Sequence, residues 1–251
     1  MVNSNSLLTI GYSTLAEREK NIQFLDSFKN LVIVQGSTSL ATSQTGSTYK
    51  RIELPSRGVA KSRNAAISNT ETKYLLFGDD DIVFNEDSIN SAIAYLESHS
   101  DISILLLQTV DEKNVLRKSY PSKAHNLKLT NSAKAATYEM IIRVEDFKSK
   151  SIYFDEDFGA GAKNYLGDEY ILIADALRAG LIGRVLPIVI ATHPSESSGS
   201  LRNTKADALA RSKVFSRVFG ILAPFMRLLF ILKPPSKRFG FLLTVRFILG
   251  R

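Results

Sequence analysis

Cysteine is absent from the 251-residue sequence, which excludes disulfides, thiolate metal sites and a cysteine nucleophile. The polar first six residues lack the basic region and apolar core of a secretory signal peptide, so we expect none. Long apolar runs are also missing, because the longest nearly apolar run, residues 218–232, contains Arg227. A membrane-spanning helix needs about 20 apolar residues. The sequence therefore does not predict a transmembrane segment.

Acidic residues are nearly absent from the last fifth of the chain. From residue 206 onward nine Lys or Arg accompany one acid, Asp207, so this tail has a net charge of +8 and residues 1–205 have −1. Its apolar groups have basic flanks, which is typical of helices that lie in a membrane interface. Packing on the rest of the chain or a homo-oligomer interface is the alternative. The many Phe, Leu and Ile residues argue against a nucleic-acid partner.

Expected strands and helices alternate along residues 7–191. Strands are predicted at 7–10, 31–34, 49–54, 74–77, 102–107, 137–144 and 184–191. Helices are predicted after a cap at Ser13 or Thr14, within 57–67, at 88–97 and at 166–179. The polar residues 111–136 are expected to form an excursion over the site. This alternation predicts an α/β layered fold with a mostly parallel sheet.

Three consecutive carboxylates, Asp79, Asp80 and Asp81, follow the apolar strand predicted at 74–77. Ligands bind at the carboxyl ends of strands in open α/β sheets, and Mg²⁺ and Mn²⁺ prefer oxygen ligands. A cation site is one interpretation. The other is an acidic turn in water, with Asp81 or Asn85 capping the next helix.

Three further segments carry candidate residues. Cations, among them Arg63, lie near the start of the helix predicted within 57–67, where anions are favoured. Asp168 and Glu169 open the helix at 166–179, and the dipole alone would favour acids there. His193 follows the last predicted strand, and a neutral imidazole can bind a transition metal.

Taken in order, these segments resemble a family 2 glycosyltransferase of the GT-A fold over about residues 5–195. The resemblance rests on the strand end at 11–14, on Arg63 and Asn64 in a Gly…Ala-Arg-Asn-like helix, on an Asp-x-Asp at 79–81, on a Gly-Glu-Asp-like segment at 167–169, and on His193. Two features depart from the family. Residues 35–37 are Gln-Gly-Ser where an Asp pair is usual, and the acids at 168–169 are in swapped order.

The resemblance implies a Rossmann-like sheet and inverting transfer of a sugar from a nucleoside diphosphate sugar, with a UDP-sugar favoured, to a hydroxyl of a glycan acceptor. It implies Mn²⁺ or Mg²⁺ held by Asp81, with Asp79 and His193 as further ligands. By position Glu169 is the catalytic base, and Asp168 is the alternative. The residues implied to bind the nucleotide sugar are Ser13, Thr14, Arg63, Asn64, Asp79, Asp80, Arg202 and Lys205.

We therefore expect a catalytic domain at residues 1–205 and a basic amphipathic helical appendage at 206–251. The appendage predicts a peripheral protein on the cytoplasmic face of a membrane and, with the family resemblance, a lipid-linked acceptor used in surface polysaccharide synthesis. Two other functions are open at this point. A nucleotidyltransferase would normally show a Gly-rich basic loop after the first strand, which residues 12–18 lack. A non-catalytic membrane adaptor is the other.

Overall fold

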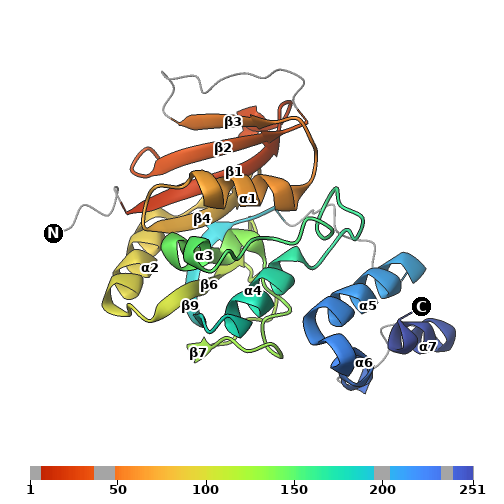
Figure 1. Cartoon of the computed structure of the whole chain (residues 1–251). Helices are drawn as coiled ribbons and strands as arrows, with labels where there is room; N and C mark the ends of the chain where they lie inside the picture. The colour runs from red at the N-terminus through yellow and green to blue at the C-terminus, as the bar shows by residue number, and fades with distance from the viewer. Residues whose placement is uncertain (1–6, 37–48, 195–203, 233–239, 251) are drawn as a thin grey trace.

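The computed structural model describes residues 7–36, 49–194, 204–232 and 240–250. Within them a nine-stranded sheet has the order β3-β2-β1-β4-β8-β6-β9-β5, and β7 pairs with β9 (Figure 1). The strands are β1 Leu8–Leu15, β2 Lys29–Gln35, β3 Lys50–Leu54, β4 Tyr74–Asp79, β5 Val83–Phe84, β6 Ile102–Val110, β7 His125–Asn126, β8 Met140–Arg143 and β9 Ile182–Thr192.

Most of these strands run in one direction, as the sequence predicts. Strands β3, β2, β1 and β4 are mutually parallel, and β6 is parallel to β9. Strand β8 is antiparallel to both β4 and β6, so it joins two parallel groups of the same direction. The short strands β5 and β7 are antiparallel to β9. The carboxyl ends of β1, β4 and β9 therefore lie along one edge of the sheet.

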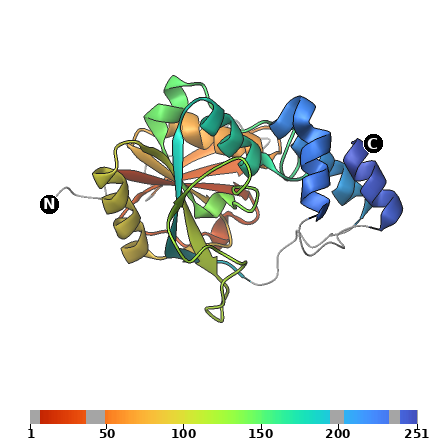
Figure 2. The same ribbon diagram turned by 90° about the horizontal axis from the view of Figure 1, so that it is seen from below.

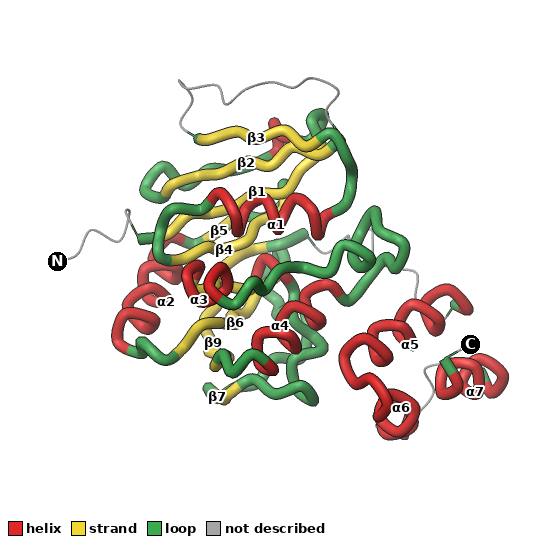
Figure 3. Tube along the Cα trace, viewed as in Figure 1, coloured by secondary structure: helices red, strands yellow, loops and turns green. Residues whose placement is uncertain are grey.

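Helices cover both faces of the sheet (Figures 2 and 3). One face packs on α2 (Glu86–Ser98) through Ile89, Ile93 and Leu96. The other face packs on α1 (Val59–Asn69), α3 (Val144–Ser149) and α4 (Asp168–Arg178). Three short 3₁₀ turns are η2 (Glu19–Asn21), η3 (Thr137–Glu139) and η4 (Gly220–Leu222). The strands in the middle of the sheet are buried on both faces, as expected for a parallel sheet.

The helix predicted after Ser13 or Thr14 is wrong. Strand β1 continues to Leu15, because residues 13–15 still pair with β2 and Ser13 also pairs with β4. The Thr14 hydroxyl donates to the Asp80 carboxylate at 2.7 Å instead of capping a helix. Only the turn η2 follows. Likewise, the strand predicted at 137–144 begins at Met140, after the 3₁₀ turn η3.

Three helices follow the sheet: α5 (Lys205–Phe219), α6 (Ala223–Leu232) and α7 (Phe241–Leu249). Helix α5 packs on α4, where Val214 and Val218 join a hydrophobic cluster with Tyr170 and Ile171. Arg217 adds ion pairs of 2.7 Å to both Asp155 and Asp175. The boundary predicted after residue 205 stays a prediction, but α5 itself is packed on the sheet domain.

Arg227 is buried where these three helices meet, with 3% of its surface exposed. Its guanidinium donates to the Ser212 carbonyl of α5 at 2.7 Å and to the Ile248 carbonyl of α7 at 3.1 Å. A buried charge that lacks partners is costly, so these hydrogen bonds hold α5, α6 and α7 together. Arg227 therefore does not contribute a surface charge to the tail.

Large apolar side chains are exposed on η4, α6 and α7. Residues 205–232 are long and apolar enough, by length and composition, to cross a membrane. They do not form one straight helix, because α5 ends at Gly220, where φ is +52°, and η4 separates it from α6. We call the following exposed residues the apolar face: Ile221, Leu222, Phe225, Leu228, Leu229, Leu232, Phe241, Leu242, Val245 and Leu249.

Candidate active site

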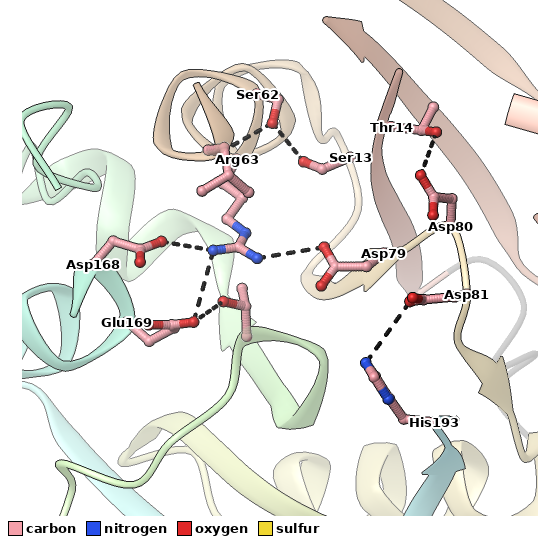
Figure 4. A network of polar contacts seen from close by, with 12 residues as sticks. Ser13, Thr14, Ser62, Arg63, Asp79, Asp80, Asp81, Asp168, Glu169 and His193 are labelled. Atoms are coloured by element: carbon pink, nitrogen blue, oxygen red, sulfur yellow. Dashed lines mark hydrogen bonds and ion pairs between the residues drawn. The ribbon is translucent and has the colours of Figure 1, made fainter. Parts of the chain in front are cut away.

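The three consecutive carboxylates that begin with the last residue of β4, Asp79, point in three directions (Figure 4). Asp79 faces Arg63 at 3.3 Å. Asp80 is buried and accepts a hydrogen bond from Thr14, and Arg18 forms an ion pair with it. Burial raises the pKa of Asp80, although Thr14 and Arg18 oppose this shift. Asp80 thus fixes the turn to the end of β1, and its two neighbours are left facing the cavity.

Asp81 and His193 face each other across the open end of the sheet. The His193 Nε2 atom lies 3.8 Å from an oxygen of Asp81. The two-residue strand β5 creates this pair, because Val83 pairs with Thr192 at the end of β9. The Asp81 side chain is 37% exposed, whereas His193 is buried, and its Nδ1 lies 2.8 Å from the Pro194 carbonyl oxygen. His193 therefore has a fixed ring with one nitrogen directed at Asp81.

Arg63 of α1 lies between the two groups of acids. Its guanidinium is buried and contacts Asp168 at 2.6 Å, Asp79 at 3.3 Å and Glu169 at 3.9 Å. The ring of Phe154 lies 5.7 Å from the guanidinium carbon and covers one side of it. Arg63 connects the acids after β4 to the acids that open α4.

The two acids at the start of α4 differ in their surroundings. Asp168 is buried and paired with Arg63, whereas the side chain of Glu169 is 24% exposed and accepts a hydrogen bond from Thr137 at 3.1 Å. Burial, together with the neighbouring Asp168 carboxylate, raises the pKa of Glu169 to about 8. Glu169 is therefore the acid of the pair that is placed to exchange a proton near neutral pH.

The turn η3 contacts two residues of this site, and the sequence analysis did not predict this turn. Thr137 donates to Glu169, and the ring of Tyr138 lies 4.9 Å from the ring of His193. Glu139 is buried and accepts hydrogen bonds from Thr109 at 2.8 Å and Lys118 at 2.7 Å. Three consecutive residues thus position Glu169, His193 and the excursion at 111–136.

The acids, Arg63 and His193 described above line a cavity of about 690 Å³, which we call the first cavity. Its charged lining comprises three guanidinium groups and five carboxyl groups, together with His193. A cavity with this balance repels a diphosphate unless a cation is bound as well. The charged residues are Arg18, Arg57, Arg63, Asp79, Asp80, Asp81, Asp168 and Glu169.

The predicted nucleotide-sugar residues are only partly brought together here. Ser13, Thr14, Arg63, Asp79 and Asp80 line the first cavity, but Asn64 points elsewhere. Its amide exchanges hydrogen bonds of 3.0 and 2.7 Å with the backbone of Phe154. These bonds connect α1 to the turn that follows Phe154. Lys205 is exposed at the start of α5. Arg202 lies outside the described residues.

Arg18 and Gln35 were missed as site residues. Arg18 pairs with Asp80 and lies 3.6 Å from Asp81, but it sits where a helix was expected. Gln35 lines the first cavity, and its side-chain oxygen accepts a hydrogen bond from the Gly58 amide at 2.9 Å. Gln35 thus has a structural task at the position where the resemblance implies an acid.

The predicted metal ligands fit a cation only as a pair. The part of the chain that the structure describes contains no group of three or more His, Asp or Glu side chains that could hold a metal. Asp79 is turned to Arg63, so it is not placed beside Asp81 and His193. Mg²⁺ is usually bound through one or two carboxylates plus substrate phosphates, and an imidazole also suits transition metals. Asp81 and His193 match such a partial ligand set.

Comparison with known proteins gives two kinds of match. Residues 24–155, slightly more than half of the chain, match Glycosyl transferase family 2. Poly(ribitol-phosphate) beta-N-acetylglucosaminyltransferase TarS of Staphylococcus aureus is 26% identical over 166 residues, which are 62% of this chain and 28% of TarS. The chain thus spans little more than a quarter of the curated relative.

Solved structures share the fold. The structure of S. aureus TarS residues 1–349 in complex with UDP-GlcNAc has a TM-score of 0.57 at 16% identity and covers 85% of this chain and 67% of its own. The mannosyltransferase PcManGT from Pyrobaculum calidifontis, in complex with GDP-Man and Mn²⁺, has a TM-score of 0.52 at 13% identity. That match covers 97% of this chain and 68% of PcManGT.

Proposed function

The chain belongs to glycosyl transferase family 2 and is a glycosyltransferase with a GT-A fold, and we propose that it transfers a sugar from a UDP-sugar to a hydroxyl group with inversion. The observation that carries the proposal is the first cavity, whose lining brings Asp81 and His193 together with Arg63 and Glu169. TarS, which is bound to UDP-GlcNAc in one structure, supports a UDP-sugar donor. The family match argues against the nucleotidyltransferase alternative, and measured donor turnover separates an enzyme from the adaptor alternative.

The donor's diphosphate would lie at the carboxyl ends of β1 and β4. Asp81 and His193 would hold Mn²⁺ or Mg²⁺, which neutralises charge that develops on the leaving diphosphate. Arg18 pairs with Asp80, and Arg57 also lines the cavity, so both guanidinium groups can add positive charge. Asp80, which is buried and paired, keeps the turn rigid.

Glu169 would act as the base that takes the proton of the acceptor hydroxyl. Its hydrogen bond from Thr137 orients the carboxyl, and its partial exposure leaves it accessible from the cavity. Asp168 forms an ion pair with Arg63, and this ion pair positions the Arg63 guanidinium between the two groups of acids. The two acids of the swapped segment therefore have different tasks.

The donor is tested by measuring nucleotide release from UDP-GlcNAc, UDP-glucose, UDP-galactose, GDP-mannose, dTDP-glucose and CMP-sialic acid with Mn²⁺ or Mg²⁺. We expect a UDP-sugar to give at least tenfold faster release than any donor with another base. Asp101→Ala removes a carboxylate from an exposed turn before β6 and should leave the donor preference unchanged. It is the matched control for Asp81→Ala. Faster release of GDP, dTDP or CMP would contradict the UDP-sugar assignment and leave the family unaffected.

The apolar face supports a peripheral location on a membrane that carries a lipid-linked acceptor. Ten large apolar side chains are exposed on this face. Large exposed apolar patches usually mark an interaction surface. The part of the tail's charge that can reach anionic lipid is smaller than the sequence suggests, since Arg227 is buried, Arg211 pairs with Asp207 at 2.9 Å and Arg217 pairs with two acids. Apolar insertion would thus supply most of the affinity.

We expect the protein to sediment with vesicles that contain anionic lipid and to remain largely bound when salt is raised, because salt screens only the exposed charges. Phe225→Asp with Leu228→Asp should abolish sedimentation, whereas Ser91→Asp on α2, remote from the apolar face, should not. A stable oligomer that ignores vesicles and that the double variant dissociates would make the apolar face an assembly surface instead.

A further inference from the structure

A second cavity of about 600 Å³ lies between the excursion at 111–136, helix α4 and the helices α5 and α6. Its volume is in the range of about 300–1,000 Å³ that is typical of small-molecule sites. The excursion closes one side with Ser119, Tyr120 and Ala133, and α5 and α6 close the other with Phe215 and Phe230. Nothing in the roles described so far uses this space.

The second cavity shares part of its wall with the first one. Leu166 and Gly167 line both cavities. The residues that follow them in the chain are Asp168 and Glu169, and Thr137, which donates to Glu169, lies between Ala135 and Glu139 of the second cavity. Glu169 itself lines the first cavity, so an acceptor whose hydroxyl group reaches Glu169 would enter the second cavity by passing Leu166 and Gly167.

The lining indicates what such a molecule is made of. Leu106, Leu107, Tyr170 and Val214 add apolar walls to those of Phe215 and Phe230. Of the three Lys and Arg side chains in the lining, Lys118 pairs with Glu139 at 2.7 Å, Arg211 pairs with Asp207 at 2.9 Å, and Lys134 is exposed. A site built for an anion would leave such charges available. The second cavity is suited to an apolar chain with a small polar head.

We propose that the second cavity binds the apolar chain of a glycolipid acceptor, with the hydroxyl-bearing sugar next to Glu169. The inference rests on the proposed function, because it needs Glu169 at the sugar end. It also explains the position of the apolar face, since the helices α5 and α6 that wall the cavity lead to Ile221, Leu222 and Phe225.

The test uses full-length protein and octyl glycosides of glucose, galactose and N-acetylglucosamine below their micelle concentrations, with the methyl glycosides as short-chain partners. Binding is measured by calorimetry, and transfer by nucleotide release from the donor that the screen identifies. Ala133→Trp and Ser119→Trp fill the second cavity from exposed positions on the excursion. Ser91→Trp on α2 adds the same side chain on the opposite face of the sheet.

We expect octyl glycosides to bind at least tenfold more tightly than methyl glycosides, and one of them to raise nucleotide release above hydrolysis by water. Ala133→Trp and Ser119→Trp should remove both effects with UDP affinity unchanged, and Ser91→Trp should keep them. Equal binding of octyl and methyl glycosides overturns the proposal. Chain-dependent binding with no increase in nucleotide release also overturns it, because the bound glycoside would then not be an acceptor. If the unmodified protein releases no nucleotide from any donor, the result would instead count against the proposed function.

Discussion

Replacing Glu169 by Gln should reduce kcat by about 10²–10⁴-fold, the contribution that a positioned general base usually makes. Gln keeps the shape of the side chain and can still accept the hydrogen bond from Thr137, which is 3.1 Å long in the unmodified protein. It cannot take a proton from the acceptor hydroxyl. UDP affinity should be unchanged, and single-turnover transfer combined with nucleotide binding by calorimetry would show both results.

Asp168→Asn is the matched control, because it neutralises the adjacent acid. Asp168 is buried and paired with Arg63 at 2.6 Å, so this variant should lower the melting temperature and reduce kcat less than Glu169→Gln does. The reverse ranking would assign the base to Asp168. Near-normal transfer in both variants would remove this helix start from the mechanism.

The pH dependence follows from the raised pKa of Glu169. Burial and the Asp168 carboxylate place that pKa at about 8, above the ordinary value of the side chain. A base works when ionised, so kcat/KM should rise about tenfold per pH unit below pH 7 and level off above pH 8. The residual activity of Glu169→Gln should lack this rise. The pKa of Glu169 is about 8 in the folded protein and near its ordinary value of 4.5 in the unfolded chain. Between these two values the folded protein retains the proton and the unfolded chain loses it, so the free energy of unfolding decreases as the pH rises to 8.

Replacing Asp81 by Ala should reduce kcat/KM by about 10²-fold or more, since a bound cation contributes several kcal/mol of charge stabilisation. Asp81 is the carboxylate that faces His193 at 3.8 Å. The variant should also lose the increase in UDP affinity that Mn²⁺ gives the unmodified protein, which calorimetry with and without Mn²⁺ measures. Asp101→Ala should retain that increase.

A chelator should stop transfer by the unmodified protein, and added Mn²⁺ should restore it. If transfer continues in excess chelator, the cation is not required, and the Asp81–His193 pair would bind the donor directly. His193→Ala separates the two readings further. It should weaken Mn²⁺-dependent UDP binding if the imidazole is a ligand, and leave it unchanged if the ring only packs on Tyr138.

The fold and the strongest site signals were accessible from the sequence because they depend on local patterns. The run at 74–77 is apolar and buried, so the strand that precedes Asp79 was predicted correctly. The acids at 168–169 open α4 as expected. The family resemblance implied that the acids at 79–81, the acids at 168–169 and His193 belong to one site, and all of them line the first cavity.

The site features that the sequence did not predict depend on very short elements or on contacts between residues far apart in the chain. The Asp81–His193 pair is set by β5, a strand of two residues that carries almost no periodic signal. The three residues of η3 were hidden within a predicted strand. The sequence predicts Arg18 within a helix because Ser13 and Thr14 are good caps. In the structure Ser13 and Thr14 extend β1, and their hydroxyl groups contact residues 49 and 66 positions further along the chain.

The contact between Gly167 and α5 limits how this chain can be recombined with others. A Cβ atom at position 167 would come within 2.5 Å of a Val214 methyl group, and φ at Gly167 is +93°. A larger residue on either side would push α5 away from the helix that carries Glu169. A chimera joined at residue 205 would thus bring a foreign α5 onto this glycine. A junction at the exposed Gly220 would keep the matched pair and exchange only the helices that carry the apolar face.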